Sequence, residues 1–226
     1  MAPFIFREKN GVHIIDLRQT VERLQLAFNF VEQVVRHGDS ILFVGTKKSA
    51  QDAVASEATR CGMPYVNARW MGGMLTNFRT VELRLRRMHE LQQMQQNGEM
   101  DALPKREALV LLDDLRRMER NLGGMRDLRR VPSAIFVVDT RKEHLAMAEA
   151  HRLDVPIVGL VDTNVDPDEV DYPIPANDDG IRSVQLICRY IADAVLEARM
   201  QNESTGTRTV AEPAPAPEPD EEEVPV

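Results

Sequence analysis

Runs of apolar residues separated by segments with helical spacing predict a sheet of parallel strands connected by helices. The apolar runs cover residues 41–45, 64–67, 133–139 and 156–162. Their continuity is typical of strands that are buried on both faces of a sheet. Helical spacing follows at about 49–60, 143–152 and 181–199. Because such alternation requires right-handed crossovers, we predict an α/β fold with a doubly wound parallel sheet.

The beginning of the chain follows the same order, with a strand before a helix. A short β-branched run covers residues 12–15, and Asp16 can cap the amphipathic segment that extends to about His37. The glycine after His37 is a natural end for this helix. Towards the carboxyl end, the proline-containing stretch 167–175 predicts a loop before the last helix.

The alternation breaks at residues 76–118, which have helical spacing and no strand run. An interruption at 97–104 divides this stretch into two helices joined by a loop. Apolar residues recur at steps of three and four, at Phe78, Val81, Leu85 and Met88 and at Ala108, Leu111, Leu115, Met118 and Leu122. We therefore predict an inserted antiparallel helical hairpin of the coiled-coil type. The expected units are an α/β domain at 1–75 and 123–200, the hairpin at 76–122 and a tail at 201–226.

Charge is distributed unevenly along the chain. The formal net charge is -8, but residues 201–226 hold seven acidic residues against Arg208 alone and account for -6 of it. This tail alternates Pro and Ala around an acidic cluster, and we predict disorder because it cannot bury enough apolar surface. From Arg60 to Lys142, sixteen Lys and Arg stand against ten Asp and Glu, a net of +6. This local excess suits the binding of phosphate groups.

Three aspartates, Asp16, Asp139 and Asp162, each follow a predicted strand. Ligands usually bind at the carboxyl ends of the strands in open α/β sheets, so these carboxylates could hold Mg²⁺ or accept a phosphoryl group. Alternatively, each aspartate caps the turn or helix that follows it, which the neighbouring Thr140 and Thr163 favour. The sequence leaves both interpretations open, and capping is the simpler one.

The segment 45–49, which reads Gly-Thr-Lys-Lys-Ser, lies between a predicted strand and a helix. Its amides and the ammonium groups of Lys47 and Lys48 could bind a phosphate. The second glycine of a nucleotide-binding phosphate loop is absent, so a bound nucleotide is not predicted. Backbone phosphates of RNA remain compatible with this segment, and so does an ordinary solvated turn.

The segment Arg69 to Gly73 holds the single tryptophan of the chain beside a pair of glycines. Exposed Arg69 and Trp70 side chains could stack on an unpaired base, while the glycines permit a close approach of the backbone. Alternatively, Trp70 fills the space beneath the hairpin, as most large aromatic side chains are buried.

Arginines are frequent on the predicted hairpin and beyond its end, at Arg84, Arg86, Arg87, Arg116, Arg117, Arg120, Arg126, Arg129 and Arg130. Guanidinium groups are suited to bidentate contacts with phosphate. Acidic residues are interleaved with them, so a solvent face with internal salt bridges explains part of the pattern equally well. The two cysteines and five histidines lack the spacing of a metal site or a catalytic triad, and we predict no cofactor and no catalytic residue.

Several motifs resemble those of the bacterial small-subunit ribosomal protein S-two family. They are Phe4-Ile5-Phe6 with Asn10-Gly11-Val12-His13-Ile14-Ile15-Asp16-Leu17, Phe43-Val44-Gly45-Thr46-Lys47-Lys48, Arg69-Trp70-Met71-Gly72-Gly73-Met74-Leu75-Thr76-Asn77-Phe78, Leu122-Gly123-Gly124, Pro156-Ile157-Val158-Gly159-Leu160-Val161-Asp162-Thr163-Asn164 and Ile174-Pro175-Ala176-Asn177-Asp178-Asp179. The resemblance covers nearly all of residues 3–200 in one order. It implies a flavodoxin-like domain of five parallel strands, a protruding helical hairpin and no catalysis. Family members usually begin earlier, with a helical arm, so we expect Met1 to be an internal methionine or the start of a form without that arm.

The resemblance also implies a function. Family members are structural constituents of the small ribosomal subunit that bind ribosomal RNA and help dock the messenger-binding protein S-one during translation. The implied partners are this RNA and other small-subunit proteins including S-one, with no membrane and no small-molecule substrate. The sequence lacks an apolar run of membrane-spanning length and a signal peptide, which predicts a cytoplasmic protein. By motif position and charge, the candidate RNA-binding residues are Lys47, Lys48, Arg69, Trp70, Asn77, Arg79, Arg84, Arg87, Arg141 and Lys142.

Overall fold

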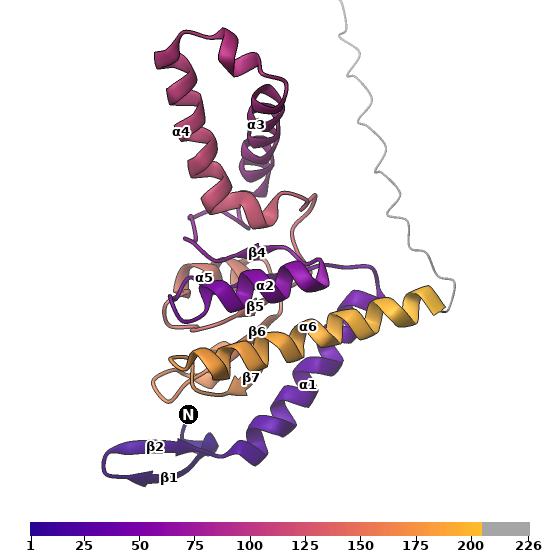
Figure 1. Cartoon of the computed structure of the whole chain (residues 1–226). Coiled ribbons are helices and arrows are strands. Elements are labelled where there is room, and N and C mark those ends of the chain that lie inside the picture. Colours follow the sequence, from indigo (N-terminus) through magenta and orange to yellow (C-terminus); the bar gives the residue numbers. More distant parts are fainter. Residues whose placement is uncertain (205–226) are drawn as a thin grey trace, which may run out of the picture.

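A five-stranded parallel sheet forms the centre of the protein, as a computed structural model that describes residues 1–204 shows (Figure 1). The strands are β3 (Ile41–Val44), β4 (Tyr65–Val66), β5 (Ala134–Val137), β6 (Ile157–Val161) and β7 (Tyr172–Pro175). They lie in the order β4-β3-β5-β6-β7, and each neighbouring pair is parallel. Renumbered along the chain, this is the 2-1-3-4-5 order of flavodoxin-like folds. The predicted doubly wound sheet is therefore confirmed.

Alternate residues of the strands face two separate apolar layers. Ile41 and Phe43 of β3 belong to one buried cluster, and Leu42 and Val44 belong to the other. The first cluster is shared with α1 (Leu17–Arg36), α2 (Gln51–Cys61) and α6 (Ile181–Ser204). The second is shared with α5 (His144–Arg152) and with the two helices described next. Burial on both faces explains why the strands are continuous apolar runs.

Two long helices, α3 (Phe78–Gln96) and α4 (Lys105–Leu122), pack against each other and extend away from the sheet (Figure 1). The 3-10 turn η2 (Glu99–Ala102) joins them, so the chain reverses direction between the two helices. Their shared seam is apolar, and the residues buried there are Val81, Leu85, Met88, Leu91, Met100, Leu115 and Leu122. These side chains belong to the same cluster as one face of the sheet, so the base of the helix pair rests on the α/β layers.

The chain returns from α4 to the sheet through the 3-10 turn η3 (Gly123–Met125), which passes close to β4. A Cβ atom at Gly124 would lie against the carbonyl oxygen of Tyr65 and 2.7 Å from Cδ2 of its ring. At Gly123, a Cβ atom would have no heavy atom within 4 Å. Glycine at position 124 therefore lets the base of the helix pair rest directly on the edge strand.

The strand predicted at residues 12–15 exists, but it lies outside the central sheet. In the described residues, strand β2 (Val12–Ile15) pairs with β1 (Ile5–Lys9) alone, antiparallel, and the 3-10 turn η1 (Ala2–Phe4) precedes them. Val12 is 65% exposed, whereas an inner strand of a parallel sheet is buried on both faces. The interpretation that placed Asp16 on the same sheet edge as Asp139 and Asp162 is therefore wrong.

The fifth strand of the sheet occurs where the prolines predicted a loop. After the 3-10 turn η4 (Pro167–Glu169), strand β7 contains both Pro173 and Pro175. Proline cannot donate to a ladder, but among residues 1–204 β7 is an edge strand that pairs on one side with β6 alone. The unpaired side has no need of backbone donors, so two prolines are tolerated there.

Helix α6 continues to Ser204, beyond its predicted end near residue 199. The predicted disorder of the acidic tail concerns mainly residues 205–226, which lie outside the described part of the chain. Within residues 1–204, the helices all lack the combination of length and apolar character that a transmembrane segment needs.

Candidate nucleic-acid interface

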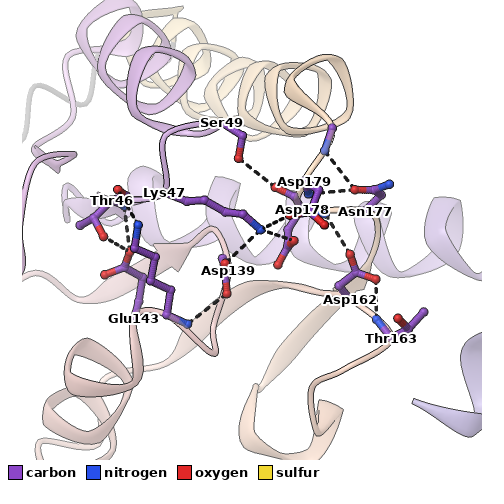
Figure 2. A network of polar contacts seen from close by, with 12 residues as sticks. Thr46, Lys47, Ser49, Asp139, Glu143, Asp162, Thr163, Asn177, Asp178 and Asp179 are labelled. Atoms are coloured by element: carbon purple, nitrogen blue, oxygen red, sulfur yellow. Dashed lines mark hydrogen bonds and ion pairs between the residues drawn. The ribbon is translucent and has the colours of Figure 1, made fainter.

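The carboxyl ends of β3 and β5 meet where the strand order reverses, the usual ligand position in this class of sheet. Lys47 follows β3 and points into a group of carboxylates (Figure 2). Its Nζ atom lies 3.1 Å from Asp139 Oδ2, 2.7 Å from Asp178 Oδ1 and 2.6 Å from Asp179 Oδ1. These ion pairs join the β3 loop, the end of β5 and the segment before α6. The protein's own lysine thus occupies the position where related folds hold a ligand.

The charges of this cluster influence one another. Burial alone would lower the pKa of Lys47, but its hydrogen bonds to Asp178, Asp179 and Asp139 outweigh burial and raise the pKa above its ordinary value. For Asp178, burial raises the pKa, and the nearby carboxylates of Asp139 and Asp162 add to it against the opposing effect of Lys47. The ammonium group of Lys47 is therefore charged at neutral pH and is the element that keeps these carboxylates together.

A second set of hydrogen bonds joins the same loop to the start of α5. Glu143 is 3% exposed, and its Oε1 accepts from the Thr46 amide at 2.8 Å and from Thr46 Oγ1 at 2.5 Å (Figure 2). Burial raises the pKa of Glu143, while the bonds from Thr46 oppose that rise. Lys142 Nζ donates to the Thr46 carbonyl oxygen at 3.0 Å. The loop after β3 is therefore held at both Thr46 and Lys47.

The aspartates Asp16, Asp139 and Asp162 do not form one ligand group. Asp16 caps α1 by accepting a hydrogen bond from the Arg18 amide at 3.0 Å, which confirms the capping interpretation at this position. Asp162 accepts from the amides of Thr163 and Asp178 (Figure 2). In residues 1–204, the acidic group that is close enough to hold a metal ion is Asp162, Asp178 and Asp179, whose oxygens lie within 4.8 Å of one another.

The segment between β4 and α3, residues 69–78, is called the elbow below. It is organised around the carboxylate of Glu149 on α5. Oε1 accepts from Trp70 Nε1 at 3.1 Å and from the Gly73 amide at 2.7 Å. Oε2 accepts from the Leu75 amide at 2.9 Å and from both the amide and the hydroxyl of Thr76 at 3.1 Å. A single carboxylate therefore fixes the path of the chain into the helix pair.

Trp70 is 6% exposed and lies in the apolar cluster that also contains Val81 and Leu122 of the helix pair. Its ring fills the space beneath α3 and α4, and its indole nitrogen is bonded to Glu149. A ring in this position has no free face on which a base could stack. The structure therefore favours the packing interpretation of Trp70.

Acidification should release the elbow through Glu149. Burial would raise the pKa of Glu149, but the hydrogen bonds from Thr76, Leu75, Trp70 and Gly73 outweigh it and lower the pKa below the ordinary 4.5. A lowered pKa in the folded state stabilises the protein above the unfolded-state pKa, and this contribution disappears as the pH falls through the folded-state value. We expect the fluorescence of Trp70, the single tryptophan, to shift to the red once the pH falls below the ordinary pKa of a glutamate. A Glu149→Gln variant should lack this transition; an identical titration in both proteins would contradict the assignment.

The residues predicted to bind RNA fall into two groups. Lys47, Trp70 and Lys142 are engaged as described, Arg87 pairs with Glu90 at 3.0 Å, and Asn77 Oδ1 accepts from Thr80 Oγ1 at 2.9 Å. The other side chains are exposed and have no ionic or hydrogen-bonding partner within residues 1–204. They are Lys48, Arg69, Arg79, Arg84 and Arg141. This second group is available to an external phosphate.

Sequence reasoning did not find the carboxylates that organise this region. Asp178, Asp179, Glu143 and Glu149 were not proposed as site residues, although Asp178 and Asp179 end one of the family motifs. Asp178 is 131 positions away from Lys47, so no local spacing relates the two. Two buried acids, Glu143 at 3% and Asp178 at 4% exposure, are unusual enough to identify such a network once a fold is known.

Fold and surface together define a class of protein. It is a flavodoxin-like α/β domain that keeps the charges at its strand ends in internal ion pairs and presents unpaired cations on its loops and on the helix pair. Residues 1–198 match the sequence profile of Ribosomal protein S2. The chain belongs to the Ribosomal protein S2 family, whose members are structural proteins and not enzymes, as the sequence predicted.

Curated relatives agree with this membership. Small ribosomal subunit protein uS2 of Mycolicibacterium gilvum is 56% identical over 206 residues, which cover 91% of this chain and 74% of that protein. The protein of the same name from Mycolicibacterium vanbaalenii is 52% identical over 225 residues, 99% of this chain and 82% of the relative. That of Mycobacterium tuberculosis is 57% identical over 197 residues, 87% of this chain and 69% of the relative.

Proposed function

We propose that the protein is a structural component of the small ribosomal subunit that binds ribosomal RNA through unpaired cations. The relatives named small ribosomal subunit protein uS2 support the assembly. The proposed RNA contact rests on exposed cations that have no partner within residues 1–204. They occur on the β3 and β5 loops, in the elbow and on α3. We propose these as direct phosphate contacts: Lys48, Arg69, Arg79, Arg84 and Arg141.

The remaining predicted residues have a supporting part in this proposal. Lys47 and Lys142 fix the loops that carry Lys48 and Arg141, and Trp70 fixes the elbow. Arg87 and Asn77 are exposed and reach RNA after exchanging their present partners, Glu90 and Thr80. Exposed ion pairs contribute about 0–1 kcal/mol, so such an exchange costs little.

Co-sedimentation tests the proposal. Wild-type protein added to small subunits that lack it should pellet with them at about 0.1 M salt. Replacing the five proposed contact residues by Gln should leave the chain at the top of the gradient, because each lost phosphate contact removes the free energy of counterion release. The same loss lowers the salt slope of log Kobs by about 0.7–0.9 for each contact. A matched control replaces five other exposed cations, Lys9, Arg18, Arg152, Arg182 and Arg189. The proposal would be contradicted if both variants pelleted with the subunits. It would also be contradicted if neither the wild type nor the control pelleted.

The proposed function includes docking of the messenger-binding protein S-one. An apolar groove of about 790 Å³ lies between β2, α1 and α6, and several of its apolar side chains are exposed, at Val12, Leu17, Val21 and Leu186. Contiguous exposed apolar surface is typical of a protein-binding site. The same gradient tests this part: S-one should associate with subunits that contain the wild-type chain and less with those that contain a Val21→Asp, Leu186→Asp variant.

A further inference from the structure

A cleft of about 790 Å³, lined mainly by charged and amide residues, lies between the end of β4 and the last turns of α4. One wall carries Asn67 and Arg69, which follow β4. The other wall carries Arg117, Arg120 and Asn121 of α4. Figure 1 shows α4 descending towards β4, so this cleft lies where the helix pair meets the edge of the sheet. A ligand seated there contacts both parts of the protein.

The cleft is positively charged and its cations are available. Arg69, Arg117 and Arg120 are exposed and have no ionic or hydrogen-bonding partner within residues 1–204. The carboxylate of the lining, Glu119, accepts a hydrogen bond from Gln92 of α3 at 2.8 Å, so it is already engaged within the helix pair. Most other arginines of the helix pair that have acidic neighbours form ion pairs, such as Arg86 with Glu82 and Arg116 with Asp113.

We propose that this cleft binds the ribose-phosphate backbone of RNA, gripping it between Arg69 on one side and Arg117 and Arg120 on the other. This inference rests on the proposed function and names a site within it. Arg117 and Arg120 are three positions apart on α4, which puts them on one face of the helix about 5–6 Å apart at Cβ. Two guanidinium groups on one wall and a third opposite can contact phosphates from both sides.

The lining distinguishes an RNA backbone from an acidic peptide. Peptide grooves depend on apolar pockets for alternate side chains, and here Ala68 is the one apolar residue of the lining. The amides of Asn67 and Asn121 lie beside the arginines instead. Asn67 donates to the Gln51 carbonyl oxygen at 3.2 Å, and its own amide oxygen has no donor within the described residues 1–204. Amides of this kind can hydrogen-bond a ribose 2′-hydroxyl, the group that distinguishes RNA from DNA.

Binding in the cleft has a consequence for the helix pair. Arg69 belongs to the elbow that Glu149 organises, whereas Arg117 and Arg120 belong to α4. An RNA backbone held by all three groups connects the elbow to the last turns of α4 and holds α4 against the sheet edge. Trp70, next to Arg69 in the sequence, lies at this junction and reports on it by fluorescence.

The test measures binding of the full chain to RNA extracted from small subunits, at a series of KCl concentrations. A cleft variant carries Arg69→Gln, Arg117→Gln and Arg120→Gln. A charge-matched control carries Arg18→Gln, Arg152→Gln and Arg182→Gln, which are also exposed and unpaired within residues 1–204. We expect the cleft variant to lose about two units of salt slope and about tenfold to a hundredfold in affinity, while the control retains the wild-type values.

Several outcomes separate this inference from the proposed function. If the wild type binds RNA and the cleft variant binds like the control, the cleft is refuted while the proposed function stands. If the wild type does not bind RNA, the proposed function itself fails. Tighter binding of polyglutamate than of RNA, lost in the cleft variant, would overturn the assignment in favour of an acidic protein. Equal unfolding midpoints of the cleft variant and the control exclude misfolding as the cause of weaker RNA binding. The three single substitutions at Arg69, Arg117 and Arg120 provide the same check one residue at a time.

Discussion

The Lys47→Met variant is expected to be about 2–3 kcal/mol less stable than the wild type at neutral pH. The substitution leaves Asp139 and Asp178 close together, with Asp162 nearby, after removing the charge that neutralises them. Removing one partner of a fully buried pair costs about 3–5 kcal/mol, and the expected value here is smaller because Asp179 is exposed. Urea unfolding followed by circular dichroism measures the difference.

The neighbouring lysine supplies the control. Lys48 is exposed and has no partner within residues 1–204, so Lys48→Met should change stability by less than about 0.5 kcal/mol.

The pH dependence of the stability of the Lys47→Met variant is a second check. Without Lys47, the carboxylate of Asp178, whose pKa burial already raises, binds its proton more readily in the folded state than in the unfolded state. The variant therefore regains stability as the pH falls, and the gap to the wild type should narrow. Equal losses in both variants would refute the internal role of Lys47.

The Gly124→Ala variant is expected to lose about 2–4 kcal/mol and to displace the base of the helix pair. The new methyl group would meet the carbonyl oxygen of Tyr65 and lie 2.8 Å from Cε2 of its ring, so β4 and the turn η3 have to separate. The backbone of an edge strand cannot move aside as a flexible side chain can. Unfolding experiments measure the loss, and a red shift of Trp70 fluorescence should accompany the displacement.

Gly123→Ala is the matched control for this second prediction. Its methyl group meets no heavy atom within 4 Å, and the substitution lies in the same turn. Alanine also has a lower conformational entropy in the unfolded chain than glycine, so this variant should be neutral or more stable by a few tenths of a kcal/mol. If both substitutions have the same effect, contact between the turn and β4 does not determine the position of the helix pair.

The central strands could be predicted because burial on both faces requires continuous apolar runs. The segments 41–45 and 156–162 show this directly, and the structure has β3 and β6 there. Strand β7 escaped prediction because its prolines are typical of loops, and only its position at the sheet edge makes them acceptable. The edge position is a property of the assembled sheet and cannot be read from residues 172–175 alone.

At the candidate site, the sequence likewise could not show which charged side chains are engaged by internal partners. The sequence correctly indicated that Lys47 and Lys48 lie in a loop between a strand and a helix, but both lysines looked equally available to phosphate. Lys47 is engaged and Lys48 is exposed because the fold brings Asp178 and Asp179, which are distant in sequence, to Lys47. Similarly, the burial of Trp70 depends on Glu149, 79 positions later in the chain. Local spacing predicts which elements form, and distant partners decide which of their charges remain free.

Because the ion pairs of Lys47 are internal, salt should affect the stability of the fold much less than it affects the proposed binding to RNA. Mobile ions weaken contacts between exposed charges over a Debye length of about 8–10 Å, but they affect partly buried pairs much less. Raising the ionic strength should therefore weaken the proposed contacts with RNA while the fold remains intact. Protein washed from subunits at high salt should consequently rebind after dialysis, with no separate refolding step.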